Sequence, residues 1–404
     1  MVTSASLLAK VKEASKAVPY DGSNPEQVDE KTKALQDIIG ILKDEDRAVS
    51  LLTDNTMPHV MNLFAANLFR ALRGPKADFD PDQDLPQKDP AWVHLELIYE
   101  LLTIVIQAPI PPRVAKRYIT PTLCTQWIGL LRSQDQEERL AVATILHKLY
   151  AKFKSLRATF RQTVGYTFLQ FVEEPSLYPF GIGELLEVYA SIIKGFATPL
   201  LPDHTTFMIK NMLPLLKPAP LPTYHQPLLL CLTMYLEKDQ TTMHAMLSHL
   251  IKFWPWQATS KQILFINTVE EILELTPIEE ITKAEKRQLG GVLGKCLESQ
   301  HFQVAERTLF LWNNPFLINH SILNQEHARD LLPIFFPPLF KAFKFHWNIT
   351  VRGLARSVLE MYTKYDFAGY RRCLDSFETD QIAQIVAQDQ KEAKWQQLYD
   401  QIPS

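Results

Sequence analysis

Apolar residues recur along most of this chain at spacings of three and four, which is the period of an amphipathic helix. No stretch of any length alternates apolar and polar residues as a half-buried strand does. The pattern predicts an all-α protein. Its expected helices cover residues 31–43, 57–72, 92–106, 122–132, 136–155, 158–171, 183–196, 205–216, 224–236, 242–253, 260–275, 283–297, 302–312, 324–343, 349–365 and 377–401.

Turn residues, above all prolines, separate the expected helices, as in the run of Pro109, Pro111 and Pro112. Pairs of helices begin roughly every forty residues, which is the period of HEAT or armadillo solenoids. We therefore predict one solenoid of about eight helix pairs over residues 29–404. A flexible segment with a short helix is expected at 1–28, and a long acidic loop at 73–90.

The segment 136–157, QEERLAVATILHKLYAKFKSLR, has the clearest apolar stripe and is the one around which we expect the chain to be organised. The stripe consists of Val142, Ile145, Leu146, Leu149 and Phe153. We expect the last four of these side chains to be mostly buried.

Three residues of the same segment lie off the stripe: His147, Tyr150 and Arg157. If the helix stays regular to Arg157, the phenol and guanidinium groups are nearly in register and the imidazole is close by. An aromatic hydroxyl, a titratable ring and a planar cation together suit an acidic peptide ligand. The same three residues also fit an ordinary exposed face between neighbouring helices.

Composition narrows the class of protein. The net charge is −3 over 404 residues, so the chain has no excess of basic residues with which to bind nucleic-acid phosphates. It has 13 glycines, which are few for a doubly wound nucleotide-binding fold. The four cysteines are dispersed without a CxxC pair, so we expect a reducing compartment and neither disulfides nor zinc. The first residues do not have the pattern of a signal peptide, and no apolar run is long enough to cross a bilayer.

Catalytic and metal motifs are lacking. There is no GxSxG, HExxH, GxxxxGK[ST] or GxGxxG sequence. Asp80, Asp82 and Asp84 alternate as in a calcium loop, but the glycine and glutamate of such a loop are missing. His147 with Glu187 would be the one acid–base pair to consider, and no nucleophile is placed near it. The sequence therefore predicts a protein that is not an enzyme and needs no cofactor.

Several blocks, in order, carry a resemblance to a known family. They are MNLFAANLFRAL, FDPDQDLP, PAWVHLELIYE, LHKLYAKFKSLR, GELLEVYASIIKGFATPL, YLEKD, HFQVAERTLFLWNN and HWNITVRGL. Between about residue 57 and residue 366 the chain resembles the regulatory B-prime subunits of protein phosphatase 2A.

The resemblance implies a non-catalytic regulatory and substrate-targeting subunit of a serine/threonine phosphatase holoenzyme, docked on the scaffold and catalytic subunits. It also implies a groove that recruits substrates through short LxxIxE peptides. The groove residues that match are His147, Lys148, Tyr150, Arg157, Glu187, Val188, Ile192 and His204. Arg157 would pair with the peptide glutamate, or with a phosphoserine near it, while Val188 and Ile192 would line the pocket for its isoleucine. Asp135, Glu137 and Glu138 match an acidic turn that would contact the phosphatase core.

The chain departs from the family pattern at Leu140, Lys148, Val188 and Leu201, and one residue is expected to be inserted near Pro179. The family usually has arginine in place of Lys148 and lysine in place of Leu201, so we expect lower affinity for very acidic peptides. These departures keep a second function open, that of a general helical-repeat scaffold or transport adaptor without a phosphatase. The expected location is the cytoplasm, and the nucleus in addition.

Overall fold

The computed structural model describes residues 3–72, 88–174 and 179–400, without the side chains of 384–386 and 396–400. These residues form the helices α1 to α20 and several single 3₁₀ or π turns, and no strand occurs among them. The predicted all-α fold is confirmed. The chain divides into two compact units, Met1–Met234 and Tyr235–Ser404, with α12 (His225–Lys238) running across the boundary.

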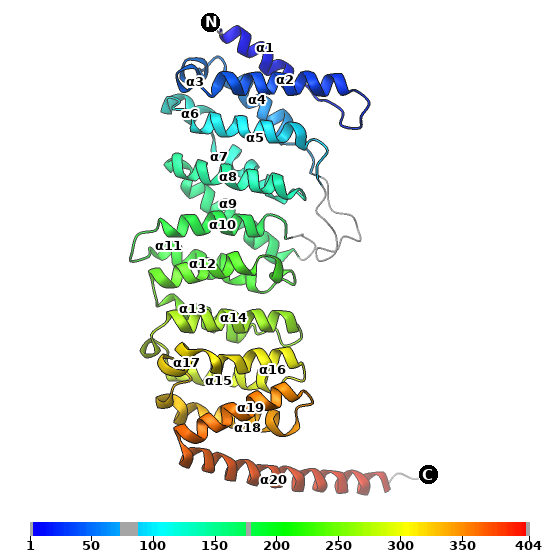
Figure 1. Ribbon diagram of the computed structural model, residues 1–404, viewed down its shortest axis with the longest axis vertical. Helices are drawn as coiled ribbons and strands as arrows, with labels where there is room; N and C mark the ends of the chain where they lie inside the picture. Colours follow the sequence, from blue (N-terminus) through cyan, green and yellow to red (C-terminus); the bar gives the residue numbers. More distant parts are fainter. Residues whose placement is uncertain (1–2, 73–87, 175–178, 401–404) are drawn as a thin grey trace. The chain divides into compact units, whose positions relative to one another are not determined.

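The first unit consists of helices in two layers, as in a HEAT-type solenoid (Figure 1). In one layer, successive helices contact each other in the order α2 (Pro25–Leu42), α5 (Trp92–Gln107), α8 (Gln136–Lys152) and α10 (Ile182–Lys194). The other layer contains α1 (Ser4–Ala14), α4 (Met57–Leu68), α7 (Pro121–Gly129) and α9 (Arg157–Glu173). Short helices connect the layers: α3 (Glu45–Leu51), α6 (Pro112–Tyr118) and α11 (Pro202–Phe207).

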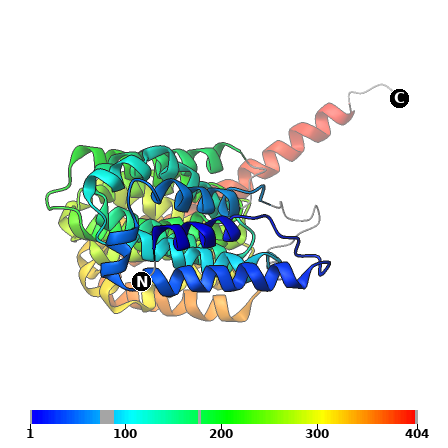
Figure 2. The same cartoon turned by 90° about the horizontal axis from the view of Figure 1, so that it is seen from above.

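The second unit repeats this arrangement. One layer runs through α13 (Thr242–Lys252), α15 (Lys283–Leu297), α18 (Ala328–Phe345) and α20 (Phe367–Asp400). The other runs through α14 (Thr259–Leu275), α16 (Phe302–Leu309) and α19 (Ile349–Tyr365), with α17 (Pro315–His320) as a connector. The C-terminal part of α20 extends away from the helices that precede it in this unit (Figure 2).

The predicted helices mostly match the observed ones, and the differences have local causes. The helices α3, α6 and α17 are six or seven residues long, which is too short for a helical period to show. The expected helix 205–216 is instead α11 followed by a π turn, Met208–Met212, and a 3₁₀ turn that contains Pro214. The loop 73–90 and the expected insertion near Pro179 lie largely outside the described residues.

The apolar stripe of α8 is buried as predicted at Ile145, Leu146 and Leu149, which are at most 2% exposed. Phe153 is only half-buried, so that part of the prediction is wrong. The helix ends at Lys152, and Phe153 has φ −103° and ψ 83°, which turns the backbone out of the helical path. The stripe therefore stops one turn before the sequence pattern suggests.

The N-terminal helix is packed on the rest of the first unit. Leu7, Val11 and Ala14 of α1 are buried, and α1 contacts α2 and α4. Beneath it, Lys31 of α2 is 2% exposed, and its Nζ donates hydrogen bonds to Lys16 O at 2.8 Å and Asn67 Oδ1 at 2.7 Å. Burial lowers the pKa of Lys31 to about 8 from its ordinary 10.5.

This buried lysine predicts a pH effect on stability. Between about pH 8 and pH 10.5 the folded chain loses the Lys31 proton before the unfolded chain does, so stability rises with pH. The neutral amine still donates to both oxygens. We expect Lys31→Met to destabilise the protein more at about pH 9.5 than at about pH 7.5, by about 2 kcal/mol. Urea unfolding of both proteins at both pH values measures this difference, and equal losses would contradict it.

Candidate functional site

A cleft of about 480 Å³ opens in the first unit, between the end of α8 with the start of α9 on one side and the end of α10 with α11 on the other. Its lining residues are His147, Tyr150, Ala151, Arg157, Arg161, Ser191, Ile192, Gly195, Phe196, Ala197, Leu201, Asp203 and His204. Two arginines lie in one wall, and most of the apolar side chains lie in the other. A ligand in this cleft would meet a cationic surface opposite an apolar one.

Arg157 reaches Tyr150 by a reversal of the chain rather than along one helix. After α8 ends, a 3₁₀ turn, Lys154–Leu156, leads directly into α9, whose first residue is Arg157. Its Nε donates to Tyr150 O at 3.0 Å and its Nη2 to Ala151 O at 3.3 Å. The guanidinium carbon lies 4.9 Å from the centroid of the Tyr150 ring. The assumption of a regular helix to Arg157 is wrong, but the juxtaposition inferred from it exists.

These contacts fix the guanidinium without exhausting its donors. Of the five N–H groups of an arginine, two are engaged with the last carbonyls of α8, which leaves three for a ligand. Capping those carbonyls also places a positive charge at the negative end of the α8 dipole. Arg157 is thus oriented before any ligand arrives.

Arg161 is a cleft residue that the sequence reasoning missed. Its Nη1 donates to Tyr150 Oη at 3.1 Å, so the hydroxyl proton of Tyr150 remains free to be donated to a ligand. The Tyr150 ring is held in turn by an edge contact with Phe160, at a centroid distance of 5.3 Å. Arg161 follows Arg157 by four residues on α9, and this i,i+4 spacing of two cations was the available signal.

The opposite wall combines apolar and weakly basic groups. Of the apolar residues in this wall, Ile192 is 4% exposed and Leu201 is 60% exposed. The rings of Phe196 and His204 are stacked, with centroids 3.7 Å apart. Burial, and secondarily the charge of Arg161, lowers the pKa of His204, which favours its neutral imidazole at neutral pH.

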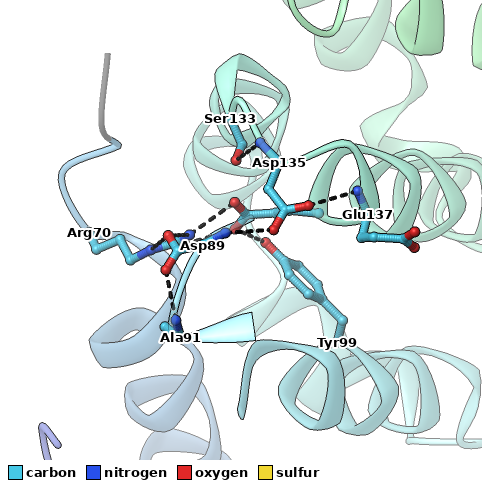
Figure 3. Close-up of polar contacts among 8 residues, drawn as sticks. Arg70, Asp89, Ala91, Tyr99, Ser133, Asp135 and Glu137 are labelled. Carbon is cyan, nitrogen blue, oxygen red and sulfur yellow. Dashed lines mark hydrogen bonds and ion pairs between the residues drawn. The ribbon is translucent and has the colours of Figure 1, made fainter. Parts of the chain in front are cut away.

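A second polar cluster surrounds the start of α8 (Figure 3). Glu138, which is fully buried, accepts hydrogen bonds from Arg70 Nη1 at 2.8 Å and Nη2 at 2.9 Å, and from Tyr99 Oη at 2.8 Å. Arg70 also donates through Nη2 to Asp89 Oδ2 at 2.7 Å. Burial alone would lower the pKa of Arg70, but the bonds to Glu138 and Asp89 outweigh it and raise it.

Asp135 completes this cluster as the N-cap of α8. Its Oδ1 accepts from Glu137 N at 3.0 Å and its Oδ2 from Asp89 N at 2.9 Å. Asp135 is 3% exposed, so its carboxylate serves the fold. The cluster ties Arg70 and Asp89 to the first turn of α8.

The part of the chain that the structure describes has the features of neither a membrane span nor a metal site. None of its helices has the length and apolar content that a bilayer span requires. Nor do three or more His, Cys, Asp or Glu side chains gather there as metal ligands would.

Comparison with known proteins gives the family. A sequence model described as "Protein phosphatase 2A regulatory B subunit (B56 family)" matches residues 3–402. This chain belongs to the B56 family. The resemblance stated from the sequence blocks is thereby confirmed. Because the family consists of regulatory subunits of a phosphatase, the prediction of a non-catalytic protein is confirmed as well.

Similar B56 relatives come from animals and plants. The phosphatase 2A 56 kDa regulatory subunit delta isoform of Oryctolagus cuniculus is 35% identical over 353 residues, which cover 86% of this chain and 59% of the relative. The phosphatase 2A 57 kDa regulatory B' beta isoform of Arabidopsis thaliana is 35% identical over a match that covers 86% of this chain and 70% of the relative. The Caenorhabditis elegans regulatory subunit pptr-1 is 34% identical, with 91% and 67% covered. The chain thus spans less than two thirds of the delta isoform.

The cleft of this B56 chain contains five of the eight residues expected in a peptide groove: His147, Tyr150, Arg157, Ile192 and His204. The other three, Lys148, Glu187 and Val188, do not line it. Val188 is 5% exposed and faces the core, and Glu187 is exposed. The arginine-to-lysine departure at Lys148 therefore lies outside the cleft, while the departure at Leu201 lies on its rim.

The three residues expected at the phosphatase contact are not equally accessible. Glu137 is exposed, whereas Asp135 and Glu138 are buried in the cluster with Arg70. Of these three side chains, only that of Glu137 is free to meet a partner directly. The acidic residues that the sequence places on one turn thus divide into one surface residue and two internal ones.

Proposed function

We propose that this chain is a non-catalytic, substrate-targeting subunit of a protein phosphatase 2A holoenzyme. It docks on the scaffold and catalytic subunits and recruits substrates that carry short acidic LxxIxE peptides. Its membership of the B56 family and the names of its relatives support the role in a phosphatase complex. The observation that carries substrate recruitment is the cleft with Arg157 opposite Ile192.

The cationic wall suits the glutamate of such a peptide. Three N–H groups of Arg157 remain available, and the Tyr150 hydroxyl can donate beside them. Arg161 adds a second positive charge at hydrogen-bond distance from Tyr150. A carboxylate, or a phosphate in its place, meets donors that are already oriented, so little side-chain entropy is lost on binding.

The other wall suits the apolar residue of the peptide. Ile192 and Phe196 line this wall and provide its apolar surface. Burying an isoleucine side chain there contributes roughly 1.5–3 kcal/mol. The exposed Leu201 offers no charge to an acidic residue, so affinity rests on the Arg157 side of the cleft.

Peptide binding should depend strongly on Arg157. We expect a labelled LxxIxE peptide to bind the wild type with micromolar affinity, and Arg157→Ala to lose at least about tenfold, or about 1.4 kcal/mol. Arg157→Lys keeps the charge but loses the planar fork, so it should also bind weakly. Fluorescence anisotropy with the folded proteins measures this.

Lys154→Ala is the matched control, because Lys154 is an exposed cation in the same turn that does not line the cleft. It should leave affinity within about twofold. Arg157→Ala also removes two hydrogen bonds to the end of α8, so a stability loss of about 1 kcal/mol is expected. Equal affinity of Arg157→Ala and Lys154→Ala would refute this use of the cleft.

A further inference from the structure

The second unit contains its own cleft, of about 290 Å³, between α18 and the first half of α20. Its apolar floor is formed by Leu332, Phe336 and Phe377. Phe336 and Phe377 are both buried, and their ring centroids are 6.3 Å apart. The volume suits one or two side chains rather than a large ligand.

One wall of the cleft is a helix with prolines in its interior. Helix α18 contains Pro333 and Pro337, and both line the cleft together with Arg329, one residue on each successive turn. Proline has no N–H and is strongly disfavoured inside a helix. The carbonyls of Arg329 and Pro333 therefore lack the donor that a regular α-helix supplies four residues later, at positions 333 and 337. Departures of this kind concentrate at functional sites.

A third acceptor lies at the opposite side of the cleft. Asp366 Oδ1 accepts from Gly369 N at 2.9 Å at the start of α20, but its Oδ2 is buried and has no hydrogen-bond donor among the described residues. Arg329 forms a long ion pair with it, in which Nε lies 3.8 Å from Oδ2 and the arginine side chain is 84% exposed. Arg329 is thus too far for a hydrogen bond and is free to swing into solvent.

The buried Asp366 Oδ2 and the two carbonyls without an i+4 donor are all acceptors, so they favour a ligand that donates hydrogen bonds. We propose that the cleft binds a peptide segment of a partner protein through a lysine or arginine side chain. The methylene stem of that side chain lies on Phe336 and Phe377. Its cationic nitrogen donates to Asp366 Oδ2 and to the carbonyls of Arg329 and Pro333. This site is separate from the acidic-peptide cleft of the first unit and takes a ligand of opposite charge.

Charge and geometry favour this ligand over an anion. Arg329 and Arg372 also line the cleft and would attract an anion, but an anion would lie against the carboxylates of Asp366 and Asp380 and leave the buried Asp366 Oδ2 without a donor. A cationic side chain satisfies the buried oxygen of Asp366, and its methylene stem lies against the apolar residues of the cleft. The exposed Arg329 then moves aside without losing a hydrogen bond.

Cys373 gives a direct readout, because it lines the cleft and is partly exposed, whereas Cys124, Cys231 and Cys296 are buried. The probe is the blocked heptapeptide Ser-Gly-Leu-Arg-Leu-Gly-Ser, at millimolar concentration, with a counterpart that has glutamate in place of arginine. The rate of Cys373 alkylation by iodoacetamide is followed by mass spectrometry on the full chain. We expect the arginine peptide to slow the alkylation of Cys373 several-fold and the glutamate peptide to leave the alkylation rate unchanged.

Two variants separate binding from stability. Asp366→Asn keeps the hydrogen bond from Gly369 N but loses the negative charge, so the peptide should no longer protect Cys373 from alkylation. Asp375→Asn is the control, because Asp375 lies on α20 outside the cleft, and protection of Cys373 should be retained. Pro337→Ala restores the N–H that closes on Pro333 O, so the thermal midpoint should be kept or raised while protection falls. Pro338→Ala is its control, because the carbonyl it affects, that of Ile334, faces Gly294 of α15.

Three results would overturn the proposal. Equal protection by the glutamate peptide would remove the charge preference. Full protection in Pro337→Ala would remove the role of the freed carbonyl. Protection by magnesium or calcium chloride alone, at the ionic strength of the peptide samples, would assign the acceptors to an inorganic cation instead.

Discussion

Glu138→Ala should destabilise the first unit by about 3 kcal/mol, the largest loss that we expect from a single charged residue in this chain. Glu138 is fully buried and is the common acceptor of Arg70 and Tyr99. Removing it leaves the Tyr99 hydroxyl without a partner and Arg70 with Asp89 alone. When one member of a buried ion pair is removed, the other remains desolvated without an opposite charge, which destabilises the folded state.

Glu137→Ala is the matched control, one residue earlier and also in the first turn of α8. Its side chain is exposed, so its loss should cost no more than about 0.5 kcal/mol through the helix dipole. Midpoints of thermal unfolding, followed by circular dichroism, compare both variants with the wild type. If the two variants lowered the midpoint equally, the cluster around Glu138 would not hold Arg70 and Asp89 to α8.

Gly181→Ala should cost about 3 kcal/mol, for a reason of backbone rather than charge. Gly181 precedes α10 and has φ +80°, a left-handed conformation that alanine adopts at a cost. An added Cβ would also lie well inside van der Waals contact with the carbonyl oxygen and Cβ of Leu131. Because Leu131 belongs to the turn before α8, neither side can move without displacing a packed helix.

Gly183→Ala, two residues later, should have the opposite sign. An added Cβ there would lie 3.8 Å from its nearest neighbour, and the residue is helical, so the gain is about 0.5–1 kcal/mol. Urea unfolding of both variants gives the comparison. A Gly181→Ala protein as stable as Gly183→Ala would show that the start of α10 is not constrained by Leu131.

The sequence predicted most helices because their apolar stripes and proline breaks are local properties. It failed where the outcome depends on a partner distant in sequence. Nothing around Glu138 indicates that Arg70, 68 residues earlier, makes it internal. An acidic turn at a helix start looks like surface, and only tertiary contacts distinguish Glu138 from Glu137.

The candidate cleft was predicted for a partly wrong reason. His147, Tyr150 and Arg157 do line one cleft, but through a chain reversal that periodicity cannot register. Arg161 was missed because its role depends on how α9 packs back on the end of α8. Conversely, Val188 was expected in the pocket from the family pattern, and the packing of α10 turns it toward the core.

We propose that this chain targets a phosphatase to substrates through its acidic-peptide cleft, and activity measured with a reconstituted holoenzyme tests this role most directly. The wild type and Arg157→Ala would each be mixed with purified scaffold and catalytic subunits, and the rate of dephosphorylation would be measured for one phosphoprotein with and without an LxxIxE segment. We expect both to form a heterotrimer, and only the wild type to accelerate the motif-bearing substrate, by about tenfold. Failure of the wild type to assemble would favour the adaptor without a phosphatase, and equal acceleration by both proteins would show that recruitment does not use this cleft.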